Sequence, residues 1–240
     1  MGRYLPKRKL ETIIEIAHRG VNGDGPGDRR SVQAMQDKEA LLQTLWRERL
    51  HAEPTCLERS SPRVQERLET VWDPGRLFLE LIASLPVGML WLWHKTPRGH
   101  VVFTHESSRY VAGPQEWQGR SFDGICYLRV ADLLNGGEQA FLIFAELLDH
   151  LLGSGAERGG GRFSDGVGLT PRLADAAERF ARDETLGYGH KELGATSPAT
   201  YFCRCLWLYL TDARRLNVLD PNIHKLFART LFQPHVWKTP

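Results

Sequence analysis

The sequence lacks the features of a membrane, secreted or strongly nucleic-acid-binding protein. Its 240 residues contain no apolar run close to the ~20 residues that a transmembrane helix needs. Thirty-one basic residues nearly cancel twenty-nine acidic ones, and the net charge of +2 does not indicate a dedicated nucleic-acid binder. The first twenty residues mix charged with apolar side chains, and we therefore expect no secretory signal there.

Cysteine is also scarce. The four cysteines form no C-x-x-C pair, and Cys203 and Cys205 would diverge by about 200° on a helix. We therefore expect reduced thiols in a cytoplasmic protein. What the sequence does contain, 42% hydrophobic and 25% charged residues, is typical of a globular protein that is long enough to bury its own core.

The first half of the chain predicts helices followed by a small sheet. Residues 1–20 could form a short helix, and the glycine-rich residues 20–30 predict a linker. Further helices are expected from Ser31, from the pair Ser61-Pro62 and over residues 77–85. These patterns indicate a helical region before the sheet.

Short runs of β-branched, aromatic and aliphatic residues predict the strands. They lie at residues 88–93, 100–104 and 125–130, with turn residues at 96–99 and 112–115 between them. We expect a small, mostly antiparallel or mixed sheet. Trp91 and Trp93 would then share one face of a strand.

The second half predicts helices again. A capping-box-like start at Asn135 precedes a helix that ends near Gly153, and residues 153–168 predict a glycine-rich loop. Three later helices should begin where a capping residue precedes a proline, at Thr170-Pro171, Ser197-Pro198 and Asp220-Pro221.

The order of helices, sheet and helices predicts an α+β fold. We divide the chain into a flexible basic arm (1–30), a helical leader (31–70) and one α+β domain (71–240).

Three segments of the second half carry the functional argument. They are Phe-Ala-Glu-Leu-Leu-Asp-His-Leu-Leu-Gly (144–153), Gly-Tyr-Gly (187–189) and the helical residues 197–210. Their order and spacing over roughly residues 72–232 resemble the catalytic half of zincin metallopeptidases of the anthrax lethal factor type. In that family one helix carries H-E-x-x-H, a Tyr-Gly element follows, and a second helix supplies a glutamate ligand. The resemblance implies a zincin-like domain.

Zincin chemistry needs three metal ligands, a glutamate that takes a proton from the metal-bound water, and a donor to the oxyanion. In this chain the three ligand positions fall on Ala145, Asp149 and Thr200, whereas Glu146 and Tyr188 keep the positions of the base and the tyrosine. Without zinc, a water molecule keeps a pKa far above neutrality, whereas zinc lowers it to about 7. The resemblance therefore implies a pseudoenzyme without a metal cofactor that binds a protein or peptide partner.

Three other side chains could act at the former metal site. Arg204 occupies a second glutamate position of the family and could pair with Glu146 or Asp149, replacing the lost positive charge. His150 and His190 could instead rebuild a ligand set. They support an alternative, an active metallopeptidase with a non-standard zinc site and Glu146 as the base. A solvated or hydrogen-bonded histidine is the simpler interpretation of each.

Positive charge gathers near the N-terminus, and this suggests a further alternative. The basic residues there include Arg3, Lys7, Arg8, Lys9 and Arg19. Such an arm could bind nucleic acid through phosphate contacts, although nearby acidic residues dilute its charge and favour a solvated tail.

Overall fold

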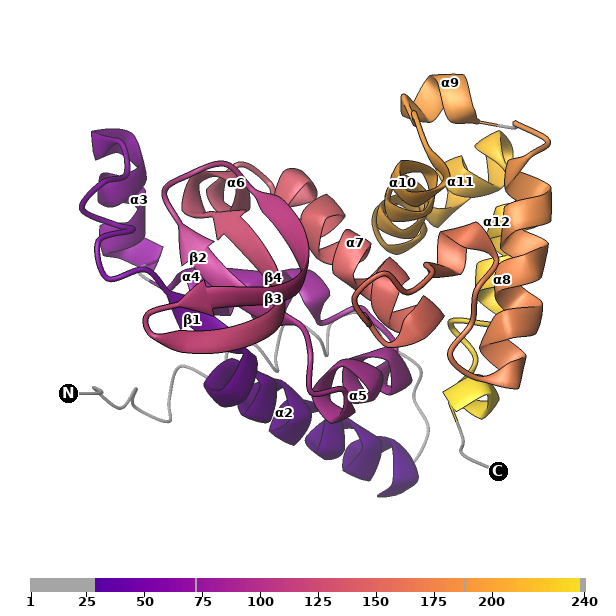
Figure 1. Ribbon diagram of the computed structural model, residues 1–240, viewed down its shortest axis with the longest axis horizontal. Coiled ribbons are helices and arrows are strands. Elements are labelled where there is room, and N and C mark those ends of the chain that lie inside the picture. Colours follow the sequence, from indigo (N-terminus) through magenta and orange to yellow (C-terminus); the bar gives the residue numbers. More distant parts are fainter. Residues whose placement is uncertain (1–28, 72, 188, 238–240) are drawn as a thin grey trace. The chain divides into compact units, whose positions relative to one another are not determined.

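The computed structural model describes residues 29–71, 73–187 and 189–237 (Figure 1). The chain divides into two compact units, residues 1–40 and 41–240. Helix α2 (Arg29–Arg49) begins in the first unit and ends in the second. The helix expected over residues 1–20, the basic arm and most of the expected linker lie outside the described residues.

The second unit begins with the end of α2 and a short strand, β1 (Leu50–Ala52). Helix α3 (Pro62–Val71) starts at the proline that the sequence marks, and α4 (Pro74–Ile82) follows. The Asp73 carboxylate caps α4 by accepting hydrogen bonds from the backbone N–H groups of Gly75 and Arg76.

One predicted strand is wrong, because residues 87–95 form helix α5 (Val87–Lys95). Met89, Leu90 and Trp93 are buried on one side, a spacing that fits a helix. The Trp93 indole donates a hydrogen bond to the Gly99 carbonyl at 2.8 Å, whereas Trp91 is exposed. The two tryptophans therefore do not share a face.

The sheet has four strands in the order β1-β2-β4-β3. Its other members are β2 (His100–Thr104), β3 (Arg109–Trp117) and β4 (Arg120–Arg129). The β1/β2 and β2/β4 pairs are parallel and only β3/β4 is antiparallel, so the sheet is mixed, which is one of the two expected arrangements, and it is not mostly antiparallel. Strand β1 lies within residues 31–70 and pairs with β2 of the following stretch.

Strand β3 occupies residues where the sequence predicts a turn. The register shifts between Val111 and Pro114, and the strand continues through this irregularity to Trp117. A proline removes a backbone donor, so it is tolerated where one side of the strand needs no partner. Pro114 therefore fits the position of β3 at the edge of the sheet.

The second half is helical, as predicted. Its helices are α6 (Val130–Leu134), α7 (Glu138–Ser154), α8 (Pro171–Glu184), α9 (His190–Leu193), α10 (Pro198–Thr211), α11 (Ala213–Leu219) and α12 (Pro221–Arg229). Short 3-10 turns lie at η2 (Phe163–Asp165) and η3 (Pro234–Trp237).

The three predicted capping residues are confirmed. The side chains of Thr170, Ser197 and Asp220 each accept backbone N–H groups at the start of a helix. Asn135, however, ends α6, and the N-cap of α7 is Gly137.

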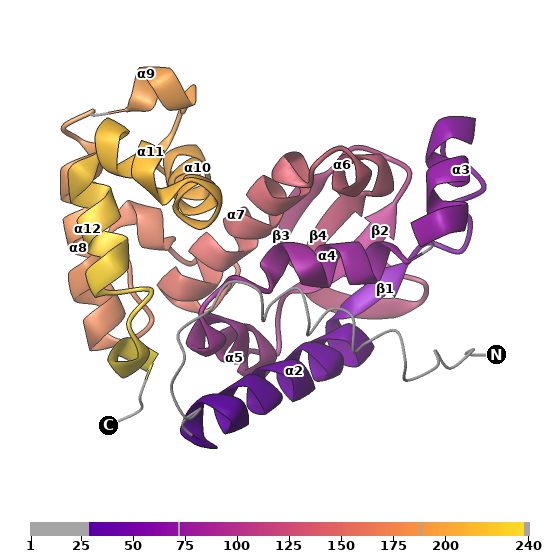
Figure 2. The ribbon, with the colours of Figure 1, turned by 180° about the vertical axis from the view of Figure 1, so that it is seen from behind.

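Helix α7 lies between the sheet and α10 (Figures 1 and 2). On the sheet side, the Phe144 ring meets Phe78 and Trp93 with centroids 5.0 and 4.9 Å apart. On the other side, Phe163, Phe180 and Phe202 form a second aromatic cluster. Burying each such ring stabilises the fold by about 2–3 kcal/mol, which fixes α7 on both sides.

The α+β class is thus confirmed. No helix in the described parts of the chain combines the length and the apolar character that crossing a bilayer requires.

Candidate functional site

Helix α7 carries the residues that the sequence singles out. Ala145 and Asp149 are 0% exposed, whereas Glu146 is only partly buried. Ala145 packs in the hydrophobic core and offers no ligand atom. The site therefore consists of polar groups on one buried helix between the sheet and α10.

Asp149 is held by the turn η2. Its two carboxylate oxygens accept hydrogen bonds from the Ser164 backbone N–H at 2.8 Å and from the Ser164 hydroxyl at 2.7 Å. The Arg162 guanidinium lies 3.8 Å from the same carboxylate. Burial nevertheless raises the pKa of Asp149 to about 7, and the Ser164 and Arg162 interactions only partly oppose this shift. We call Asp149, Arg162 and Ser164 the Asp149 cluster.

Arg162 reaches Asp149 because the loop between α7 and α8 (residues 155–170) passes directly against α7. A Cβ atom on Gly153 would lie 2.8 Å from the Arg162 Cα and closer still to the Gly161 carbonyl oxygen. Only glycine fits such an approach. The sequence predicts this loop, but not the return of its arginine to the helix.

His150 connects α7 to the edge strand. Its Nδ1 atom is 2.9 Å from the hydroxyl of Tyr110 on β3. Burial, reinforced by Arg162, lowers the pKa of His150, although the backbone carbonyls of Glu157 and Gly160 oppose the shift. A neutral, hydrogen-bonded histidine agrees with the simpler of the two interpretations from the sequence.

Glu146 differs from Asp149 because it has no hydrogen bond or ion pair with another described residue. Burial raises the pKa of Glu146 and the nearby Arg162 lowers it in part. The buried thiols of Cys126 and Cys203 lie close enough for the charge on Glu146 to help raise their pKa values, after burial itself. Glu146 is thus an acceptor that remains free within the described structure.

Thr200, the third ligand position that the resemblance implies, takes part in a helix cap. Its hydroxyl accepts hydrogen bonds from the backbone N–H groups of Thr196 and Ser197 at 3.0 and 2.9 Å. Arg204, which the sequence analysis paired with Glu146 or Asp149, has its recorded ion pair with Glu138 at 4.0 Å. The arginine beside Asp149 is Arg162, which the sequence analysis missed.

The two residues expected from the Tyr-Gly element cannot both be placed. Tyr188 lies outside the described residues. His190 begins α9, where its Nε2 atom is 3.2 Å from Glu184 and its ring stacks on Tyr201 with centroids 4.1 Å apart. These contacts tie α9 to α8 and to α10, and none is recorded between His190 and Asp149.

The donors that converge here do not suit a metal ion. Both Asp149 oxygens already accept hydrogen bonds, Ala145 supplies no donor, and Arg162 places a cation beside the carboxylate. In the parts of the chain that the structure describes, no three His, Cys, Asp or Glu side chains are grouped to hold a metal.

A second polar cluster lies on the opposite face of the sheet, and the sequence analysis missed it. The Arg49 guanidinium donates to the carbonyls of His94 and Thr96 at the end of α5 and lies 3.3 Å from the His100 Nε2. His100 Nδ1 is 3.1 Å from His51 Nε2. Burial, together with Arg49, lowers the pKa of His100 to about 3. We call Arg49, His51 and His100 the His100 cluster.

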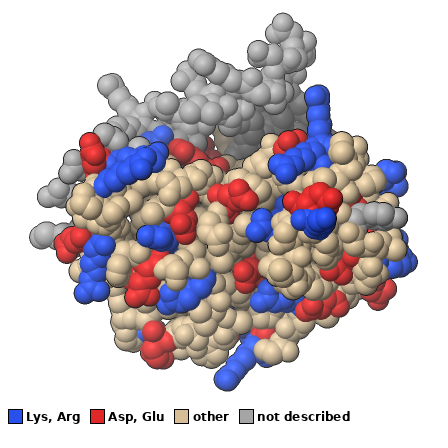
Figure 3. All heavy atoms as spheres, turned by 90° about the horizontal axis from the view of Figure 1, so that it is seen from above, with Lys and Arg blue, Asp and Glu red and all other residues tan. Residues whose placement is uncertain are grey.

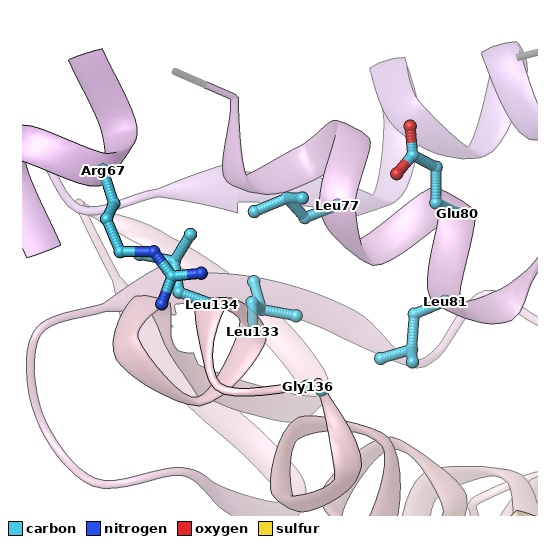
Figure 4. Close-up of a pocket in the computed structure, with 8 residues that line it drawn as sticks. Arg67, Leu77, Glu80, Leu81, Leu133, Leu134 and Gly136 are labelled. Carbon is cyan, nitrogen blue, oxygen red and sulfur yellow. The ribbon is translucent and has the colours of Figure 1, made fainter. Parts of the chain in front are cut away.

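A surface cavity of about 640 Å³ lies between α3, α4 and α6 (Figure 4). Leucine side chains line it, with Arg67 at one wall and Glu80 at another. Glu80 already pairs with Arg76 at 2.9 Å. None of the site residues named above lines this cavity.

On the face shown in Figure 3, basic and acidic side chains are interspersed.

Comparison of the chain with protein-family models, with curated proteins and with solved structures finds no match in any of the three.

Proposed function

We propose that residues 41–240 act as a non-catalytic, zincin-like domain that binds an extended segment of a protein partner along β3. The observation that carries the proposal is that all three expected ligand positions serve the fold instead. Ala145 is core, Asp149 is bonded to Ser164, and Thr200 caps α10.

Arg162 supports the loss of metal chemistry. A guanidinium beside buried carboxylates supplies the positive charge that a metal would supply. It cannot polarise a water molecule as a Lewis acid or lower its pKa to near neutrality. Glu146 therefore lacks the activated water that it would need as a general base.

The edge position of β3 supports binding by strand addition. An exposed edge strand offers unpaired backbone groups to a partner strand. Apart from the bonds within the strands, residues 109–117 have no backbone hydrogen bond to another described residue. The Tyr110–His150 contact joins this edge to α7, so a docked segment would lie beside the site residues.

The register of β3 against β4 indicates which backbone groups of β3 point away from the sheet. The Arg129 backbone N–H points to the β3 side, where it donates to the Ser108 hydroxyl at 2.8 Å. By the alternation of a strand, Tyr127 also faces β3, and its partner Arg109 faces back. Tyr110 then directs its backbone groups outward, and the exposed Ala112 follows it at the start of the irregular part of the strand.

Metal and protease assays on the full chain separate this proposal from the alternative. After incubation with zinc and removal of free metal, we expect far less than one zinc per chain by mass spectrometry. We also expect no hydrolysis of labelled casein above that of the Glu146→Gln variant. Stoichiometric zinc with Glu146-dependent hydrolysis would instead establish an active metallopeptidase.

Strand addition is tested with peptides selected on the immobilised full chain from a random library. Ala112→Pro removes a backbone N–H group from the exposed middle of β3 and fixes the backbone there, so it should abolish peptide binding, whereas Ala112→Ser should preserve it. Equal binding by both variants would show that the peptides dock elsewhere.

A further inference from the structure

We infer that the segment bound along β3 carries an acidic side chain that pairs with Arg158. This inference rests on the strand addition proposed above and names the chemistry of the partner at that site. It follows from where Arg158 lies and from the pairing of the charges around it.

Arg158 lies on the edge strand although it belongs to the loop between α7 and α8. Gly113 of β3 has a φ of +81° and is buried. A Cβ atom at Gly113 would lie 3.4 Å from the Cγ and 3.5 Å from the Cδ of Arg158. The aliphatic part of Arg158 therefore covers Gly113, which anchors the guanidinium near the middle of β3.

Two neighbouring arginines already have acidic partners. Arg98 binds Asp123 at 2.7 Å and approaches Glu157 at 3.7 Å. Arg162 is beside Asp149. Arg158, in contrast, has no ion pair or hydrogen bond with any described residue, so its charge beside the middle of β3 is not matched.

An extended peptide paired with β3 would place one of its residues opposite Ala112 or Gly113. Cross-strand neighbours have Cβ atoms about 4.5–5.5 Å apart. A glutamate there can reach the guanidinium above Gly113 and accept two parallel hydrogen bonds. A lysine at the same position would face a like charge. The edge is therefore complementary to an acidic, extended segment.

The test uses two synthetic peptides of alternating threonine and valine, with glutamate or lysine at the centre. Fluorescence anisotropy measures their affinity for the full chain, for Arg158→Glu and for Arg179→Glu, a matched reversal at an exposed arginine on α8. The glutamate peptide should bind the unmodified chain about 2–5-fold more tightly than the lysine peptide. Arg158→Glu should reverse this preference, and Arg179→Glu should leave it unchanged.

The failures of the two proposals are distinguishable. If both peptides bind with equal affinity and lose binding with Ala112→Pro, strand addition stands and the acidic preference is overturned. If neither peptide binds, or if Ala112→Pro has no effect on binding, strand addition at β3 fails and the role of Arg158 fails with it.

Discussion

The Asp149 cluster and the His100 cluster are both polar groups withdrawn from water, on opposite faces of the same sheet, yet their pKa values move in opposite directions. Burial raises the pKa of Asp149 and lowers that of His100. In both cases the neutral form is favoured. The comparison teaches that one physical cause, desolvation, makes an acid and a base respond to pH with opposite signs.

The direction in which each group changes stability with pH follows from the difference between its folded-state and unfolded-state pKa. The folded-state pKa of Asp149 lies above its unfolded value of 3.8. The protonated side chain therefore contributes fully to the free energy of unfolding below pH 3.8, and this contribution is lost as the pH rises through 7. The folded-state pKa of His100 lies below its unfolded value of 6.5, so the neutral ring contributes above that pH. Its contribution is lost as the pH falls toward 3.

Asp149→Asn should have the largest effect on the pH dependence of the free energy of unfolding. The shift from 3.8 to about 7 corresponds to a loss of up to about 4 kcal/mol of stability between pH 4 and pH 8. Without the carboxylate, urea unfolding followed by circular dichroism should show a much flatter dependence over this range. The control, Asp175→Asn at an exposed position on α8, should keep the original slope, and a steep slope in both variants would contradict the assignment.

Arg162→Leu should destabilise the chain by about 2–3 kcal/mol at pH 8, because the ionised Asp149 loses its cation. At pH 5 the loss should be smaller, since Asp149 can take up a proton instead. Urea unfolding at the two pH values measures the difference, with Arg179→Leu as the control. An equal loss at both pH values would mean that Arg162 contributes through packing alone.

His100→Gln tests whether the His100 cluster causes the loss of stability at acid pH. The variant should lose about 1 kcal/mol at pH 7, because its hydrogen bonding to Arg49 and His51 is less complete. Its stability should also fall less than that of the unmodified chain between pH 6.5 and pH 4. Thermal unfolding across this range is the measurement, and the exposed His235→Gln is the control. An unchanged acid dependence would remove His100 as its cause.

Tyr110→Phe should have the smallest effect, a loss of about 0.5–1.5 kcal/mol from the missing hydrogen bond to His150. Thermal unfolding should show no loss for Tyr209→Phe, whose hydroxyl has no hydrogen bond with a described residue. Similar losses in both variants would indicate that the Tyr110 hydroxyl contributes nothing specific.

Local signals were readable from the sequence, whereas close approaches between distant segments were not. A capping residue followed by proline marks the starts of α8, α10 and α12, because the relevant hydrogen bonds join residues at most three apart. The strand predicted at 88–93 failed because a short apolar run fits either a helix or a strand. Pro114 concealed β3, since an edge strand tolerates a proline that usually ends one.

The candidate site was predicted in part for the same reason. Asp149 and His150 follow from their position on one helix, but their partners come from other elements. Tyr110 comes from β3 and Arg162 from the loop after α7, and neither has a spacing along the chain that points to α7. Arg204 was placed near the carboxylates by analogy, whereas its recorded partner is Glu138.

Gly153 shows how such a site can depend on a residue without charge. The loop that delivers Arg162 leaves no room for even a methyl group at Gly153. A sequence that replaced this glycine with alanine would keep every ionisable residue and still separate the arginine from its acid. Related sequences that keep both Asp149 and Arg162 should therefore also keep glycine at position 153. A comparison of charged residues alone would miss this requirement.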